Sequence, residues 1–152
     1  MNGKTLGFET AAKDLFVGPY NCAQAVLGAF AGHFGLDRST AFRIATPFGG
    51  GIGHSGRMCG AVSGALMVIG LDRGVSVYAP EEKEACYALT RTFLGRFTAQ
   101  HGSVDCPALL GVDISDPEVL EGARQQDLFQ TVCTTFVGNA ARMAAEVLGL
   151  ES

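Results

Sequence analysis

The stretch FGGGIGHSGRMCGAVSGALMVIG, Phe48 to Gly70, predicts the centre of the fold. From Met58 to Asp72 the chain is apolar on most sides, which is typical of a helix buried among other helices. Gly60 and Gly64, each followed by alanine, place small residues four apart, so a second helix can approach closely. We therefore expect a glycine-rich loop before a central buried helix.

The rest of the chain also has helical rather than strand periodicity. Only Val75–Tyr78 resembles a strand, and it is short. No repeat, low-complexity segment or linker divides the chain, so we predict an all-α fold, a single-domain compact helical bundle over residues 1–152. Capping residues, glycine stops and proline positions predict the other helices at Glu9–Val17, Asn21–Gly35, Arg38–Thr46, Pro80–Gln100, Asp105–Gly111, Asp116–Gln126 and Val132–Leu148.

Composition and charge exclude several classes of function. Hydrophobic residues make up 47% of the 152 residues and charged residues 17%, which is typical of a globular core. The net charge is −4 and no basic stripe is present, which argues against a nucleic-acid partner. The longest apolar run, Ala61–Leu71, is shorter than the roughly 20 residues of a membrane helix. With no apolar signal core at the N-terminus, we expect a cytoplasmic protein without a membrane span.

The positions of the cysteines suggest chemistry. The chain has five, with no CxxC pair, which excludes a zinc ribbon and a thioredoxin-type motif. Cys86 lies within a predicted helix and is interpreted as core. The other four lie at predicted helix starts, where free amides and the helix dipole stabilise a thiolate and lower the thiol pKa. These four candidate catalytic residues are Cys22, Cys59, Cys106 and Cys133.

These four thiols are expected to converge on one site at the helix-start end of the bundle. Cys59 is the candidate attacking thiol in thiol–disulfide exchange with a redox partner protein or a small thiol. Alternatively, all four could be metal ligands for zinc or an iron–sulfur cluster. A third interpretation needs no cofactor: the thiols fill the core of a helical adaptor whose glycine- and alanine-rich face forms a homodimer. Sequence cannot choose the disulfide pairing.

The loop before Cys59 is a second candidate site. It lacks the Walker sequence and follows no strand, which argues against a nucleotide loop. Its backbone amides could hold an anion or surround the Cys59 sulfur, and a tight turn between crowded helices is the structural alternative. His101, five residues before Cys106, is a further candidate base or ligand. The candidate cofactor-binding residues of the loop are Gly49, Gly50, Gly51, Gly53 and His54.

Several segments together resemble one family. They are NCAQAVL at Asn21–Leu27, FGGGIG at Phe48–Gly53, CGAVSGAL at Cys59–Leu66, HGSVDCPALLG at His101–Gly111, and Cys133. Over about residues 10–148 the chain resembles the redox-active family labelled C_GCAxxG_C_C, whose G-C-A-x-x-G reads C-G-A-x-x-G here. The resemblance implies redox activity at the same four cysteines, excludes Cys86, and implies an association with transport functions.

Overall fold

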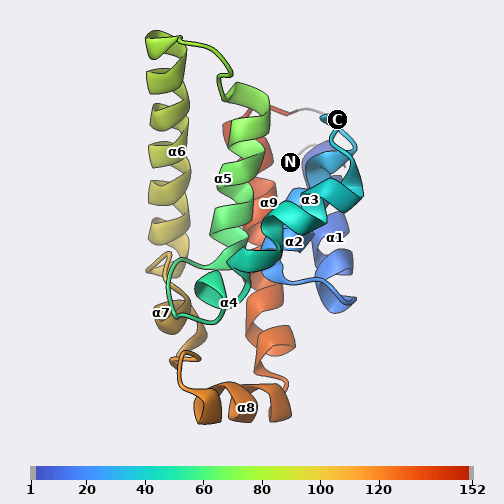
Figure 1. Cartoon of the computed structure of the whole chain (residues 1–152), viewed down its shortest axis with the longest axis vertical. Helices are drawn as coiled ribbons and strands as arrows, with labels where there is room; N and C mark the ends of the chain where they lie inside the picture. The colour runs from blue at the N-terminus through green and yellow to red at the C-terminus, as the bar shows by residue number, and fades with distance from the viewer. Residues whose placement is uncertain (1–2, 151–152) are drawn as a thin grey trace.

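The computed structural model describes residues 3–150, which form an all-α bundle without a strand (Figure 1). The predicted fold class is confirmed. No helix in this part of the chain combines the length and apolar character that a membrane crossing requires. The elements are α1 (Gly3–Val17), α2 (Cys22–Ala31), α3 (Arg38–Ala45), the 3-10 turn η1 (Thr46–Phe48), α4 (Gly49–Ile52), α5 (Gly60–Arg73), α6 (Pro80–His101), α7 (Cys106–Leu110), α8 (Pro117–Gln125), the π-turn η2 (Phe129–Cys133) and α9 (Thr134–Val147).

Helix α5 lies at the centre, as predicted. In Figure 1 it runs beside α6 on one side and α9 on the other, and α2 packs against it, while α1 packs on α2 and α9 and α3 packs on α2. Val62, Val68 and Ile69 of α5 have no exposed surface, and neither do most inward residues of α2 and α9. Burial of this apolar surface is the main force that holds the bundle together.

Glycines let α2 approach α5 closely. A Cβ at Gly64 would lie 2.9 Å from the carbonyl oxygen of Ala23 and 3.1 Å from the Cβ of Val26. A Cβ at Gly60 would lie 2.8 Å from the carbonyl oxygen of Phe48. Real Cβ atoms essentially never approach within 3.0 Å, so the small residues are required by contact, as the sequence predicted.

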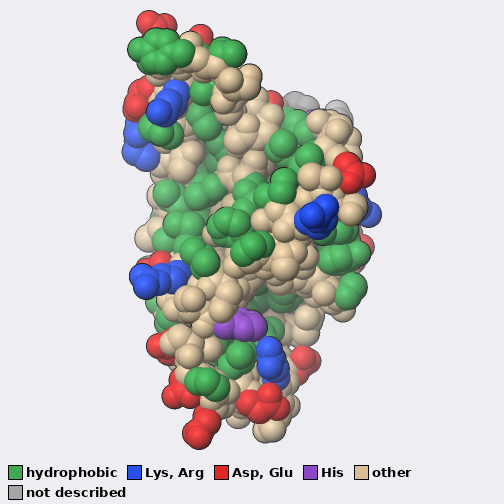
Figure 2. All heavy atoms as spheres, viewed as in Figure 1, with side chains coloured by type: hydrophobic (Ala, Val, Ile, Leu, Met, Phe, Trp, Pro, Cys, Tyr) green, Lys and Arg blue, Asp and Glu red, His purple; other side chains and the backbone are tan. Residues whose placement is uncertain are grey.

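Three predicted elements differ clearly from the structure. Helix α2 ends at Ala31 rather than Gly35. Helix α1 begins at Gly3 rather than Glu9. The segment Val75–Tyr78, which resembles a strand in sequence, is an exposed connection between α5 and α6; without a partner strand its alternation has no ladder to join. Figure 2 shows apolar side chains at this end of the molecule, where Tyr78 is 94% exposed. Among residues 3–150, the single β-bridge joins Met58 to Asp105.

The glycine-rich loop forms a left-handed turn. Five consecutive residues have positive φ: Gly50, Gly51, Ile52, Gly53 and His54. The N–H of Gly53 donates to the carbonyl oxygen of Gly49, which closes a helical turn of the opposite hand to the rest of the bundle. Glycine adopts this conformation freely, but a β-branched residue such as Ile52 is strained in it.

Replacement of Ile52 by glycine is therefore expected to raise the free energy of unfolding by about 1 kcal/mol. The side chain is 41% exposed and is not among the residues packed against the core, so little burial is lost. Urea unfolding measures the change. Ile44→Gly is the control: Ile44 is similarly exposed but lies in the right-handed α3, where glycine should destabilise by about 1 kcal/mol. Destabilisation by both variants would contradict the strain argument.

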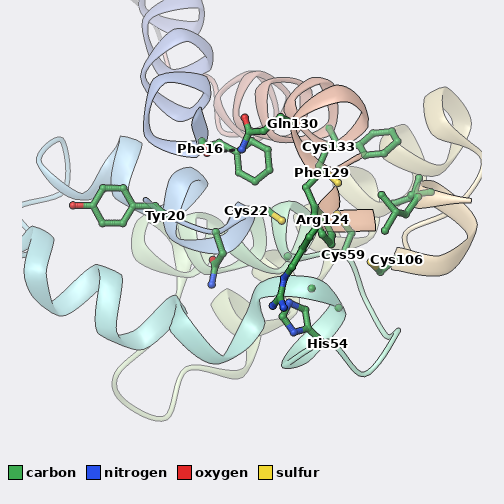
Figure 3. A pocket seen from close by; sticks show the side chains of 17 residues that line it. Phe16, Tyr20, Cys22, His54, Cys59, Cys106, Arg124, Phe129, Gln130 and Cys133 are labelled. Atoms are coloured by element: carbon green, nitrogen blue, oxygen red, sulfur yellow. Dashed lines mark hydrogen bonds between the residues drawn. The ribbon is translucent and has the colours of Figure 1, made fainter. Parts of the chain in front are cut away.

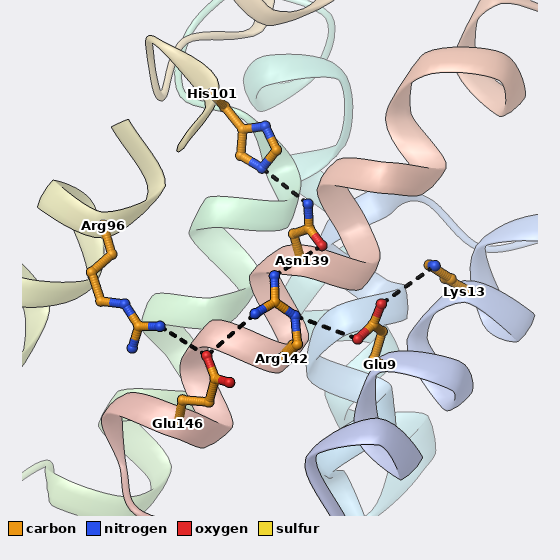
Figure 4. Close-up of polar contacts among 7 residues, drawn as sticks. All are labelled: Glu9, Lys13, Arg96, His101, Asn139, Arg142 and Glu146. Atoms are coloured by element: carbon orange, nitrogen blue, oxygen red, sulfur yellow. Dashed lines mark hydrogen bonds and ion pairs between the residues drawn. The ribbon is translucent and has the colours of Figure 1, made fainter. Parts of the chain in front are cut away.

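A chain of polar contacts ties α1 and α6 to α9 (Figure 4). Arg142 of α9 lies 3.5 Å from Glu9 of α1 and 3.4 Å from Glu146 one turn later. Arg96 of α6 reaches the same Glu146 oxygen at 2.8 Å. Because Arg142 and Glu9 are both less than one-fifth exposed, these contacts fix the relative positions of the three helices more than an exposed pair would.

Candidate functional site: a cavity lined by four cysteines

All four predicted cysteines line one cavity of about 230 Å³ (Figure 3). They come from four separate segments: the starts of α2, α5 and α7, and the π-turn η2. Their predicted convergence is confirmed as a matter of geometry. Cys86, on α6, is not among the lining residues; it is partly buried and packs against the core without belonging to it. The cysteines at the cavity are Cys22, Cys59, Cys106 and Cys133.

Backbone hydrogen bonds hold the Cys59 and Cys106 segments together. The N–H of Cys59 donates to the carbonyl oxygen of Val104 at 2.8 Å, and the N–H of Cys106 donates to that of Arg57 at 2.8 Å. These two bonds flank the β-bridge, so Cys59 is opposite Val104 and Cys106 is two residues further along. Side chains two apart on a strand share a face, which makes Cys59 and Cys106 diagonal neighbours.

Cys22 is positioned by a capping box and by Gly60. The Asn21 side chain accepts from the N–H of Gln24, and the Gln24 side chain accepts from the N–H of Asn21, both at 2.9 Å. This reciprocal pair fixes the start of α2 at Cys22. A Cβ at Gly60 would lie 3.4 Å from the Cβ of Cys22, so the glycine after Cys59 lets the Cys22 segment approach.

The position of Cys133 in the last helix differs from the prediction. It was expected in the first turn of the last helix, but the π-turn η2 runs directly into α9, so Cys133 follows a complete turn. Its N–H therefore lies within the helix and not among the free amides at a helix start. The π-turn widens the helix where Phe129, Gln130 and Cys133 face the cavity, and such turns recur at functional sites.

The glycine loop serves different cysteines from the one predicted. Gly50, Gly51 and His54 line the cavity, whereas Gly49 and Gly53 do not. A Cβ at Gly51 would lie 2.8 Å from the Cβ of Cys106. The Gly50 amide acts on the Cys22 sulfur and lowers its pKa. The expectation that the loop amides surround Cys59 is therefore wrong: the Gly50 amide acts on Cys22, and the Gly51 backbone packs against Cys106.

His101 lies outside the cavity. Its ring is packed 4.6 Å from the Phe97 ring and 4.9 Å from the Phe136 ring, between centroids, and its Nε2 lies 3.2 Å from the Asn139 amide (Figure 4). Burial, with the nearby Arg142, lowers its pKa. These contacts indicate a structural histidine between α6 and α9, so of the two histidines considered near the thiols only His54 reaches them.

Comparison with known proteins shows which family the chain matches. The family described as "Putative redox-active protein (C_GCAxxG_C_C)" matches residues 20–147, most of the chain. The chain belongs to this family. No curated protein and no solved structure matches it. The cavity thus gathers four of the five cysteines of a C_GCAxxG_C_C protein, in which redox activity is the activity that the family description names.

The thiol pKa values run opposite to the sequence expectation. Burial raises the pKa of all four cavity cysteines: that of Cys106 to about 11 and that of Cys133 to about 12. The proximity of Cys59 raises the pKa of the other three further, so Cys59 is the strongest electrostatic partner within the cluster. Desolvation and mutual repulsion outweigh the helix starts.

Among the four cavity cysteines, Cys59 has the most backbone amides that stabilise its thiolate. The amides of Ala61 and Val62, at the start of α5, oppose the rise of its pKa. Cys22 has only the Gly50 amide, and no amide lowers the pKa of Cys106 or Cys133.

The raised values predict a pH dependence. A thiol whose pKa is raised on folding contributes stability below its unfolded pKa of about 8.5 and loses it as pH rises through the folded pKa. Reduced protein should therefore lose stability between about pH 9 and 12. Urea midpoints across this range should fall more steeply for the wild type than for a Cys106→Ser/Cys133→Ser variant, which lacks these two thiols. Equal slopes would contradict the pKa assignment.

The alternative function, a metal site, requires a side-chain arrangement that the described residues of the cavity do not have. Four thiols suit zinc or an iron–sulfur cluster chemically. Among residues 3–150, however, no three histidine, cysteine, aspartate or glutamate side chains are arranged to hold one metal ion. The segments would have to move together to bind one, so the arrangement as it stands does not fit such a group.

The lining residues that the sequence did not indicate as site residues include Tyr20, Arg124 and Gln130. Arg124 comes from α8, whose sequence shows an ordinary exposed amphipathic helix. Only the fold of the chain between α7 and α9 brings it over the sulfurs. Tyr20 was detectable as the neighbour of the capping residue Asn21.

Proposed function

We propose that this protein carries out two-electron thiol–disulfide exchange at the four-cysteine cavity. The observation that carries the proposal is the convergence of the family's four cysteines on one cavity, with Cys59 as the strongest electrostatic partner of the other three. Thiols that share a small cavity can pass from attack to resolution without large movement.

The reaction balances with a small disulfide, RSSR, as oxidant. The Cys59 thiolate attacks one sulfur of RSSR, forms a Cys59–S–S–R bond and releases RS⁻. The sulfur of a second cysteine then attacks Cys59 Sγ, which forms the protein disulfide and releases the second RS⁻. The two protons lost by the cysteines go to the leaving thiolates, so two thiols of the protein are oxidised and RSSR is reduced to two RSH. A dithiol partner protein or a small thiol would reverse the change.

Cys106 is the proposed resolving cysteine. The two hydrogen bonds around the β-bridge hold its segment beside that of Cys59, with both side chains on one face. A disulfide needs Cα atoms within about 7 Å, and a diagonal pair across a bridge lies about 7–8 Å apart, so the two segments would draw slightly together on oxidation. Cys22 and Cys133 would form the second pair.

The raised pKa values predict the direction of the chemistry. A strongly oxidising couple has a stabilised thiolate in its reduced form. Here burial disfavours the thiolate, so the reduced form has no such stabilisation. We therefore expect a reducing couple, with a potential at or below the thioredoxin value of about −270 mV.

Equilibration with mixtures of reduced and oxidised dithiothreitol tests the proposal. The fraction of oxidised protein should follow a two-electron curve, and Cys59→Ser should remove it. Anaerobically purified protein provides the opposing outcomes. Stoichiometric zinc or iron that is lost in Cys59→Ser would favour a metal site. Pocket thiols that stay reduced across the whole series would favour the adaptor.

A further inference from the structure

Most of the cavity wall is apolar, and in the part of the chain that the structure describes its permanent charge comes from a single residue. Its walls are largely aromatic and aliphatic, with Phe16, Leu110 and Phe129 among them. Among the described residues that line it, Arg124 is the one permanently charged side chain, and none is acidic. A ligand that fits these walls would therefore be mostly apolar, with charge at the Arg124 end.

The other polar side chains at the cavity are occupied or uncharged. Asn21 donates to the carbonyl oxygen of Thr46, and Gln130 donates to that of Phe16 at 3.2 Å. His54 lies against Arg124 in Figure 3, and burial together with this cation lowers its pKa, which keeps the imidazole neutral at pH 7. Neither amide nor imidazole neutralises the guanidinium.

Arg124 is only loosely paired. Its nearest carboxylate, Glu121, lies 3.9 Å away one turn earlier on α8, and both side chains are more than half exposed. An exposed ion pair at that distance contributes little free energy, so an anionic group of a ligand can bind the guanidinium in place of Glu121. Asp113, the carboxylate that raises the pKa of Cys106, accepts hydrogen bonds from Ser115 and does not line the cavity.

We propose that the substrate is a small disulfide or thiol that carries a carboxylate, and that Arg124 binds this carboxylate at the mouth of the cavity. This inference rests on the proposed thiol–disulfide function and names its substrate class. Carboxylates gather on the outer surface near α8 (Figure 2), so attraction at long range is weak and the preference arises on contact.

Three disulfides of nearly equal size test it: dithiodipropionate, with two carboxylates; hydroxyethyl disulfide, which is neutral; and cystamine, with two ammonium groups. The rate constant of each with reduced protein is divided by its rate constant with dithiothreitol, which removes intrinsic reactivity. The corrected rate should be about tenfold higher for dithiodipropionate than for cystamine. In Arg124→Gln the ratio should fall to near one, and in Glu121→Gln it should rise.

Arg91→Gln is the matched control. It removes the same charge from an exposed arginine of α6 that is paired with Glu84 at 3.0 Å, and it should leave the preference unchanged. An equal loss toward all three disulfides in Arg124→Gln would assign Arg124 to thiol activation and overturn the proposal. A preference that survives in Arg124→Gln would also overturn it. No reaction with any disulfide would instead refute the proposed function itself.

Discussion

Replacement of Cys59 by serine is expected to lower the rate of thiol–disulfide exchange on the order of a hundredfold or more. Cys59 has two backbone amides that stabilise its thiolate and is the strongest electrostatic partner of each other cysteine. Without it, the three remaining thiols have high pKa values and weaker support. The measurement is the rate at which reduced protein consumes hydroxyethyl disulfide at pH 7, followed by mass spectrometry after an acid quench.

Two further variants test whether the loss of rate is specific to Cys59 as the attacking thiol. Cys86→Ser removes a thiol outside the cavity and should keep the wild-type rate. In Cys106→Ser, Cys59 should still attack the disulfide, but the Cys59–S–S–R mixed disulfide should accumulate, seen as the added mass of one RS group. A wild-type rate in Cys59→Ser would show that another cysteine attacks first.

Replacement of Gly64 by alanine is expected to lower the free energy of unfolding by about 2–3 kcal/mol. The new methyl group would meet the Ala23 carbonyl oxygen at 2.9 Å and the Val26 Cβ at 3.1 Å. Backbone cannot move aside as a side-chain tip can, so α2 must shift away from α5. Because Cys22 precedes Ala23, the same shift should slow exchange at the cavity. Urea unfolding gives the first effect and the disulfide rate the second.

Gly70→Ala is the matched control on the same helix. A Cβ at Gly70 would have no neighbour within 4 Å, so alanine should simply raise helix propensity and stabilise by about 0.5–1 kcal/mol. Opposite signs at the two glycines would support close contact between α2 and α5. Equal effects would mean that this contact is looser than described.

The features predictable from sequence were those with local causes. The central helix followed from its apolar composition, and its close contact with α2 followed from small residues at Gly60 and Gly64. The start of α2 followed from the cap at Asn21. Convergence of the cysteines was predicted because most lie at helix starts on inward faces, and the fold brings those ends together.

The features that the sequence did not predict depend on contacts between segments that are far apart in the chain. Positive φ at Ile52 has no local signature, because a β-branched residue does not favour it. The π-turn that includes Cys133 depends on how α9 packs. The pKa prediction was wrong because helix-start stabilisation is local, whereas desolvation and repulsion depend on the assembled cavity.

The most direct test of the account is to map the disulfides of the monomer after oxidation by oxidised dithiothreitol, using peptide mass spectrometry. The account predicts a reversible link between Cys59 and Cys106, with Cys86 still a free thiol. It would be contradicted by a monomer that keeps all its thiols reduced, or by links that join Cys86 or two chains instead.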